Sequence, residues 1–314
     1  MLNVFYNEQQ TTDADTGFSP SAKKPKLLVE QWLERKEPIA VRSDFQPVTR
    51  EDYYAVHEKQ HIDDVLDGKK PNGFYKMGED AKDINRSLPW TTGSFLAAAQ
   101  HAWTKKTVAM SPTSGFHHAT ENECMGFCSF NGLMVTAHKL LNENVSKVGI
   151  LDLDHHWGNG TDSIIDYLVK RGDRQRDQFH HYTVGYDGRV VKPVGRTHNN
   201  RVVYGWQGGD ATKRWLDYLP EIIAAFEGCD IVLFQAGADP HIDDPCHLMV
   251  GCEGALTNEQ FLQRDEMVFS GLKSLGLPVV WNLAGGYQTP VQKVLDIHTG
   301  TLHKCVEIYG KALV

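Results

Sequence analysis

The chain has 314 residues, of which 41% are hydrophobic and 23% are charged, as is typical of a globular protein with a sizeable core. Its formal net charge of −8 argues against a surface for nucleic acid or for an anionic membrane. No apolar run approaches the roughly 20 residues that a membrane helix requires, and the first ten residues lack the layout of a secretory signal.

The predicted elements begin after a basic, proline-containing patch, SPSAKKPK, with a helix over 27–36. We read residues 1–47 as an N-terminal extension and residues 48–314 as one α/β domain. Further helices are predicted over 51–67, 93–104, 130–143 and 256–276. Strands are predicted over 107–110, 148–154, 230–238 and 277–286. Because these strands are apolar on both faces, they indicate a parallel sheet covered by helices on both sides.

Polar side chains lie at or just after the end of each predicted strand. They are Asp154 and His156 near the strand over 148–154, Asp239 after 230–238, Tyr287 after 277–286, and His117 and His118 after 107–110. Ligands of open α/β sheets gather outside the carboxyl ends of the strands. We therefore expect these side chains to converge on one site.

The first of these segments has the spacing of a metal site. Asp152, Asp154 and His156 are two residues apart, so in an extended segment they project to the same side. Two of these side chains can bind one metal ion while the third supports them from the buried side. Asp239 can then be the third ligand of that metal. Three protein ligands leave a position for water, as in catalytic zinc sites. A single aspartate here would more often cap a helix, but Asp154, His156 and Asp239 together favour a metal.

The histidine pair and a nearby aromatic residue allow two interpretations each. His117 and His118 could be a general base beside a histidine that tunes it, or a core histidine with a surface neighbour. Their position at a strand end favours the first. Phe127, next to Gly126 on a turn, could line a narrow apolar channel or belong to the core.

A glycine pair precedes the last candidate. Gly285 and Gly286 would let the backbone approach the site closely. Tyr287 could then donate its hydroxyl to a developing oxyanion; the alternative is a core tyrosine.

Five motifs together resemble the histone deacetylase superfamily, which includes bacterial acetylpolyamine amidohydrolases. They are GFHHA, GFCSFN, DLDHHWGNGT, QAGAD…DDP and LAGGY, and weaker similarity runs over 48–298. The resemblance implies an arginase-deacetylase fold with a mostly parallel eight-stranded sheet. It also implies a zinc-dependent hydrolase that removes an acetyl or related acyl group from acyl-lysine or from a small amine. A homo-oligomer is left open.

The resemblance assigns a role to each candidate residue. It makes Asp154, His156 and Asp239 the zinc ligands, His118 the general base, His117 its buried neighbour and Tyr287 the catalytic tyrosine. It has Asp152 orient His117, Asn159 hold His118, and Phe127 with Gly126 and Gly286 contact the substrate. The backbone of Asp152, Asp154 and His156 resembles the family's structural potassium site, although FHHYTVG (179–185) departs from the usual pattern.

Three positions depart from the family pattern. Trp157 replaces a usual second histidine, so packing below the metal is expected to differ. Pro240 and His241 follow the third ligand, where small or apolar residues are usual. A turn over 86–89 (RSLP) is expected to place Ser87 where an acidic residue usually forms the rim, which weakens the case for a histone substrate.

Two other functions are compatible with parts of the sequence. A dimanganese ureohydrolase shares the implied fold but needs Asp-x-Asp where this chain has Asp239-Pro240-His241. The presence of His118, Tyr287 and all three ligands argues against a binding or sensor protein without turnover. That alternative stays open, because a blocked substrate channel would leave every motif intact. Six cysteines without a C-x-x-C pair are typical of free thiols, so we expect a cytoplasmic protein.

Overall fold

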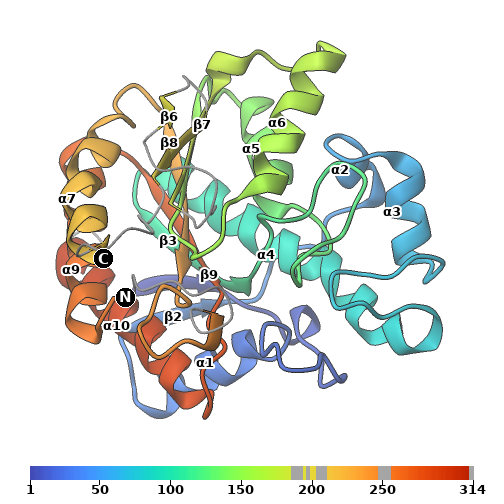
Figure 1. Cartoon of the computed structure of the whole chain (residues 1–314), viewed down its shortest axis with the longest axis horizontal. Coiled ribbons are helices and arrows are strands. Elements are labelled where there is room, and N and C mark those ends of the chain that lie inside the picture. Colours follow the sequence, from blue (N-terminus) through green and yellow to red (C-terminus); the bar gives the residue numbers. More distant parts are fainter. Residues whose placement is uncertain (185–193, 196–198, 203–210, 247–255, 311–314) are drawn as a thin grey trace.

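A computed structural model describes residues 1–184, 194–195, 199–202, 211–246 and 256–310 (Figure 1). The described strands form one sheet in the order β2-β1-β3-β9-β8-β4-β5-β7-β6. All neighbouring pairs are parallel except the short β6–β7 pair. The strands are β1 (Leu2–Phe5), β2 (Ile39–Arg42), β3 (Val108–Ser114), β4 (Val148–Asp152), β5 (Phe179–Val184), β6 (Val194–Gly195), β7 (Asn199–Val202), β8 (Ile231–Gly237) and β9 (Val279–Ala284).

Helices cover both faces of this sheet (Figure 1). They are α1 (Lys24–Glu34), α2 (Arg50–Tyr54), α3 (Lys59–Leu66), α4 (Lys82–Lys105), α5 (Gly132–Leu141), α6 (Asn159–Arg171), α7 (Ala211–Ala224), α9 (Asn258–Ser274) and α10 (Gln292–Tyr309). One hydrophobic core lies under α1, α7, α9 and α10, and a second lies under α2 to α6. The expected three-layer fold is confirmed, with nine described strands where eight were expected.

Strand β8 shows why its sequence is apolar throughout. Ile231 and Leu233 pack into the second core, whereas Val232 and Phe234 pack into the first. Successive side chains of a strand point to opposite faces, so a strand between two helical layers needs apolar residues at every position. Because β8 is buried on both faces, its end is held in place, and so is the polar segment that follows it.

Two local predictions were wrong. The single helix expected over 51–67 is divided into α2 and α3, because the backbone is extended at Glu58, whose N–H donates to the carbonyl oxygen of Glu121 at 2.7 Å. The side chain of the buried His57 also bonds outside these helices. Its Nδ1 lies 2.8 Å from the carbonyl oxygen of Thr120, and its Nε2 accepts from the backbone N–H of Asn131 at 3.1 Å. The turn expected over 86–89 lies inside α4, which continues through Pro89. The buried side chains of its apolar face stabilise this helix by packing.

The first 47 residues, assigned above to an extension, contribute to the sheet itself. Strand β1 lies between β2 and β3 and pairs in parallel with both. Helix α1 packs near α10, where the Trp32 indole N–H donates to Thr299 Oγ1 at 3.0 Å. No described helix is both long and apolar enough to cross a membrane.

Candidate active site

The predicted site residues meet at one edge of the sheet. Strands β3, β9, β8 and β4 are adjacent in that order, so the segments that follow them lie side by side. A cavity of about 220 Å³ opens there. It is lined by Phe18, Ser21, Gly115, His117, His118, Gly126, Phe127, Cys128, Asp154, His156, Cys246, Gly285 and Tyr287. Most of the candidate residues therefore surround one pocket, and Phe18, Ser21 and Cys246 join them without having been predicted.

His117 is the buried member of the histidine pair. Its Nδ1 lies 2.8 Å from Asp152 Oδ2, and its side chain is almost entirely buried. Burial lowers the pKa of His117, but the charges of Asp152 and Asp154 outweigh it and raise that pKa to about 9. Asp152 is itself held by Gln235, whose Nε2 donates to Oδ1 at 3.1 Å. The expected contact between Asp152 and His117 is present.

His118 has the surroundings of a neutral general base. Its Nδ1 lies 2.6 Å from Asn159 Oδ1, and because an amide oxygen only accepts, Nδ1 carries the proton and Nε2 is left as an acceptor. Burial lowers the pKa of His118 well below its ordinary value, and the charges of His117 and His156 lower it further. Gly126, at φ +53°, packs against the ring, since a Cβ there would lie 2.4 Å from His118 Cδ2.

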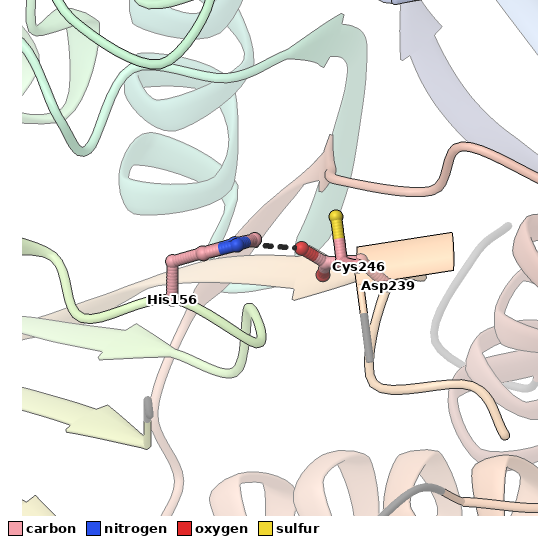
Figure 2. A group of neighbouring side chains, drawn as sticks. All are labelled: His156, Asp239 and Cys246. Atoms are coloured by element: carbon pink, nitrogen blue, oxygen red, sulfur yellow. Dashed lines mark ion pairs between the residues drawn. The ribbon is translucent and has the colours of Figure 1, made fainter. Parts of the chain in front are cut away.

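His156 lies at the separation that a tetrahedral metal site needs from each of the other two proposed ligands. His156 Nδ1 is 3.1 Å from Asp154 Oδ1 and 3.0 Å from Asp239 Oδ2. Ligands held about 2.0 Å from a tetrahedral zinc lie roughly 3.3 Å apart. Asp239 is fully buried, and its Oδ2 accepts no hydrogen bond from the described residues. Figure 2 shows His156 and Asp239 pointing at each other, so the donor set fits a zinc ion.

The electrostatics around the three proposed ligands also favour a metal ion. Burial lowers the pKa of His156, but the hydrogen bond to Asp154 and the charge of Asp239 outweigh it and raise that pKa well above its ordinary value. The two buried carboxylates therefore require a positive charge between them. The potassium site expected at this backbone stays a prediction.

The diglycine turn brings Tyr287 to the pocket. Gly285 has φ +46°, and a Cβ there would lie 2.1 Å from Asp239 Cγ, so only glycine fits. The backbone N–H of Tyr287 donates to Asp244 Oδ2 at 2.8 Å. Burial raises the pKa of the Tyr287 hydroxyl well above its ordinary value, and the charges of Asp239 and Asp154 add to the effect. The hydroxyl therefore stays protonated and can donate.

Two charged residues near this turn were not predicted. Asp244 belongs to the motif QAGAD…DDP, and it also accepts a hydrogen bond from the Cys246 backbone N–H at 3.0 Å. Its carboxylate therefore connects the loop after β8 with the loop after β9. Lys24 is fully buried and its Nζ donates to the Gly285 carbonyl. Burial lowers the pKa of Lys24 to about 8, against the opposing charges of Asp239, Asp154 and Asp244. No sequence signal separated Lys24 from its solvated neighbours in the basic patch.

The mouth of the pocket differs from the expectation. Ser87 is not a rim residue: it is buried within α4 and its hydroxyl donates to the Ile84 carbonyl at 2.8 Å. The mouth is instead formed by Phe18, whose ring is 68% exposed and meets Phe127 edge-on at 5.1 Å. Phe127 also lies 5.8 Å from the Tyr287 ring, as expected of a channel wall.

The other two departures are accommodated away from the proposed metal. The Trp157 indole N–H donates to Asp162 Oδ2 at 2.7 Å. His241 Nε2 lies 3.0 Å from Asn258 Oδ1, and its ring stacks on Phe261 at 5.7 Å. His241 therefore packs against the start of α9. The segment over 179–185, which departs from the potassium-site pattern, is described as far as residue 184, and residue 185 lies outside the described residues.

This fold and site define the class of protein. The histone deacetylase domain matches residues 21–302, and the chain belongs to that family. It is 30% identical to Histone deacetylase 18 of Arabidopsis thaliana over 257 residues, covering 74% of this chain and 36% of that protein. It is 28% identical to an acetylpolyamine amidohydrolase of Mycoplana ramosa over 209 residues, covering 63% and 55%. The matched part of the chain thus covers between about a third and just over half of the length of these curated relatives.

Solved structures show the same fold. The HDA15 HD domain superposes with a TM-score of 0.74 at 17% identity, over 98% of this chain and 94% of that one. An acetylpolyamine aminohydrolase from Burkholderia pseudomallei also gives 0.74, at 18% identity, over 98% and 99%. The resemblance expected from the five motifs is confirmed.

Proposed function

We propose that this protein is a zinc-dependent hydrolase that removes an acetyl or related acyl group from an amine. The observation that carries the proposal is the arrangement of one pocket. Two of the proposed ligands, Asp154 and His156, line it together with a neutral histidine that has a free acceptor nitrogen and a protonated tyrosine. The third proposed ligand, Asp239, lies 3.0 Å from His156. Each is a group that can promote amide hydrolysis.

The reaction follows from these groups. Zinc held by Asp154, His156 and Asp239 would polarise the amide carbonyl and lower the pKa of the attacking water. His118 Nε2 accepts a proton from that water and later delivers it to the leaving amine nitrogen. Tyr287 donates its hydroxyl hydrogen to the oxygen that becomes negative.

The remaining groups orient this machinery. Asn159 keeps the proton of His118 on Nδ1, so the acceptor nitrogen is available for water. The Asp152–His117 pair supports the base from the buried side. Phe127 and Phe18 cover the pocket with apolar surface and would exclude bulk water once an acyl chain is bound.

For the substrate, we propose an acyl-lysine side chain, an acetylpolyamine or a small N-acyl amide, following the names of the relatives. The cysteines of the described residues, at 124, 128, 229, 246 and 305, are free, which fits a cytoplasmic enzyme; Cys252 lies outside the described residues. A dimanganese site is disfavoured because His241 is engaged by Asn258 and not by the site.

The test is an assay of the zinc-loaded protein against acetyl-lysine peptides, acetylated polyamines and small N-acyl amides, with the free amine measured. We expect turnover of at least one class, and a loss of at least about a hundredfold in His118→Ala. Asp239→Asn should lose both zinc and activity. A fully loaded protein that binds these amides but turns over none would support the sensor function instead.

A further inference from the structure

A cysteine stands beside the three proposed ligands. Cys246 follows β8 on the loop that contains Asp239, and its partly buried side chain lines the pocket. Its backbone N–H is held by Asp244 Oδ1 at 3.0 Å, on the same carboxylate that holds Tyr287. The thiol is therefore placed by an anchored backbone.

The thiol is within reach of a shared metal. Cys246 Sγ, one ring nitrogen of His156 and one carboxylate oxygen of Asp239 all lie within 4.8 Å of one another. Figure 2 shows the sulfur projecting beside the Asp239 carboxylate. Asp239 Oδ2 is fully buried and accepts no hydrogen bond from the described residues, although His156 Nδ1 lies 3.0 Å away, so this carboxylate also favours a cation here.

We propose that the Cys246 thiolate is a fourth ligand of the zinc when no substrate is bound. The inference rests on the metal site of the proposed function and extends it. As the sulfur–zinc bond forms, the S–H bond breaks and its proton passes to solvent, since a coordinating thiol is deprotonated. Asp154, His156, Asp239 and Cys246 would then make a closed, four-coordinate site, whereas three ligands alone leave it open.

This arrangement has two consequences. Sulfur would occupy the position that water or the amide carbonyl needs, so the thiolate must leave before the amide is hydrolysed. A soft thiolate also favours zinc over harder divalent ions such as manganese. The simpler alternative is that Cys246 is only a pocket wall, like Cys128, which lines the same cavity but is not in the ligand cluster.

X-ray absorption at the zinc edge of the loaded, substrate-free full chain separates these alternatives. We expect one sulfur at about 2.3 Å from zinc in the wild type and in the matched control Cys128→Ala, and none in Cys246→Ala. Competition with a chelator should show at least a tenfold weaker zinc affinity for Cys246→Ala alone. A wild-type shell of nitrogen and oxygen only would overturn the inference, and this readout needs no variant to fold.

The proposed function is judged separately. If the wild type hydrolyses an N-acyl amine but its zinc has no sulfur ligand, only the proposal for Cys246 is refuted. If its zinc has a sulfur ligand but none of the three amide classes is hydrolysed, Cys246 remains a ligand and the proposed hydrolase function is refuted.

Discussion

Replacing Gly285 by alanine should remove the metal without unfolding the protein. The added Cβ would lie 2.1 Å from Asp239 Cγ, whereas non-bonded carbon atoms normally approach to about 3.5–4.0 Å. The carboxylate would have to move by more than about 1 Å. A displacement of that size at a reacting centre typically costs about a hundredfold in rate. We therefore expect zinc affinity and kcat each to fall by about two orders of magnitude.

The free-energy cost of the backbone strain can be measured separately from the effect on the carboxylate. Gly285 has φ +46°, a region that costs an alanine about 1–2 kcal/mol. Gly276 has φ +70°, and a Cβ there would meet nothing within 4 Å. Gly276→Ala is thus a matched control that carries the same kind of strain far from the carboxylate.

Both variants should melt a few degrees below the wild type. Only Gly285→Ala should lose zinc, measured by elemental analysis, and activity, measured by amine release. If Gly285→Ala kept full zinc and a normal kcat, the close approach of this turn to Asp239 would not govern the site.

Three further outcomes are expected. Tyr287→Phe should keep its zinc and its KM but lose kcat by roughly a hundred- to a thousandfold; a near-normal kcat would make Tyr287 a packing residue. Asp239→Ala should lose the metal while circular dichroism stays that of the wild type, and retained zinc would remove Asp239 from the ligand set. Stability should fall with acid, because burial lowers the pKa of His57 to about 3 and that of His298 well below its ordinary value. The unfolded chain then binds more protons below about pH 6.5, so the buried His57 alone costs about 2 kcal/mol at pH 5, and His298 acts in the same direction. Urea midpoints that do not change from pH 7 to pH 5 would contradict this.

The parts of the site that the sequence predicted share one property. Asp154, His156 and Asp239 follow buried central strands, whose apolar runs are easily recognised, and their position follows from the strand-end rule. The spacing of two residues from Asp152 to His156 then sets their common side. Strand-end chemistry is local in sequence, and the structure brings these local segments together as expected.

The parts that were missed depend on contacts between distant segments. Strands β1 and β2 have only four residues each, too few for a periodic signal. Lys24 is buried because α1 places it against the Gly285 carbonyl, a partner 261 residues away. Ser87 was misplaced because Pro89 indicated a turn, whereas packing carries α4 through it. Phe18 reaches the pocket from a loop with no recognisable motif.

The position of β9 in the sheet bears on how the protein is made. It is the only described strand that pairs with both β3 and β8, so without it β2-β1-β3 and β8-β4-β5-β7-β6 are two separate ribbons. His118 follows one ribbon, and the carboxylates that would hold the metal follow the other. A chain emerging from the ribosome therefore cannot unite its base with its ligands until residues 279–284 have been synthesised and released from the exit tunnel. Translation products that end before residue 279 should therefore be unable to carry out the proposed hydrolysis.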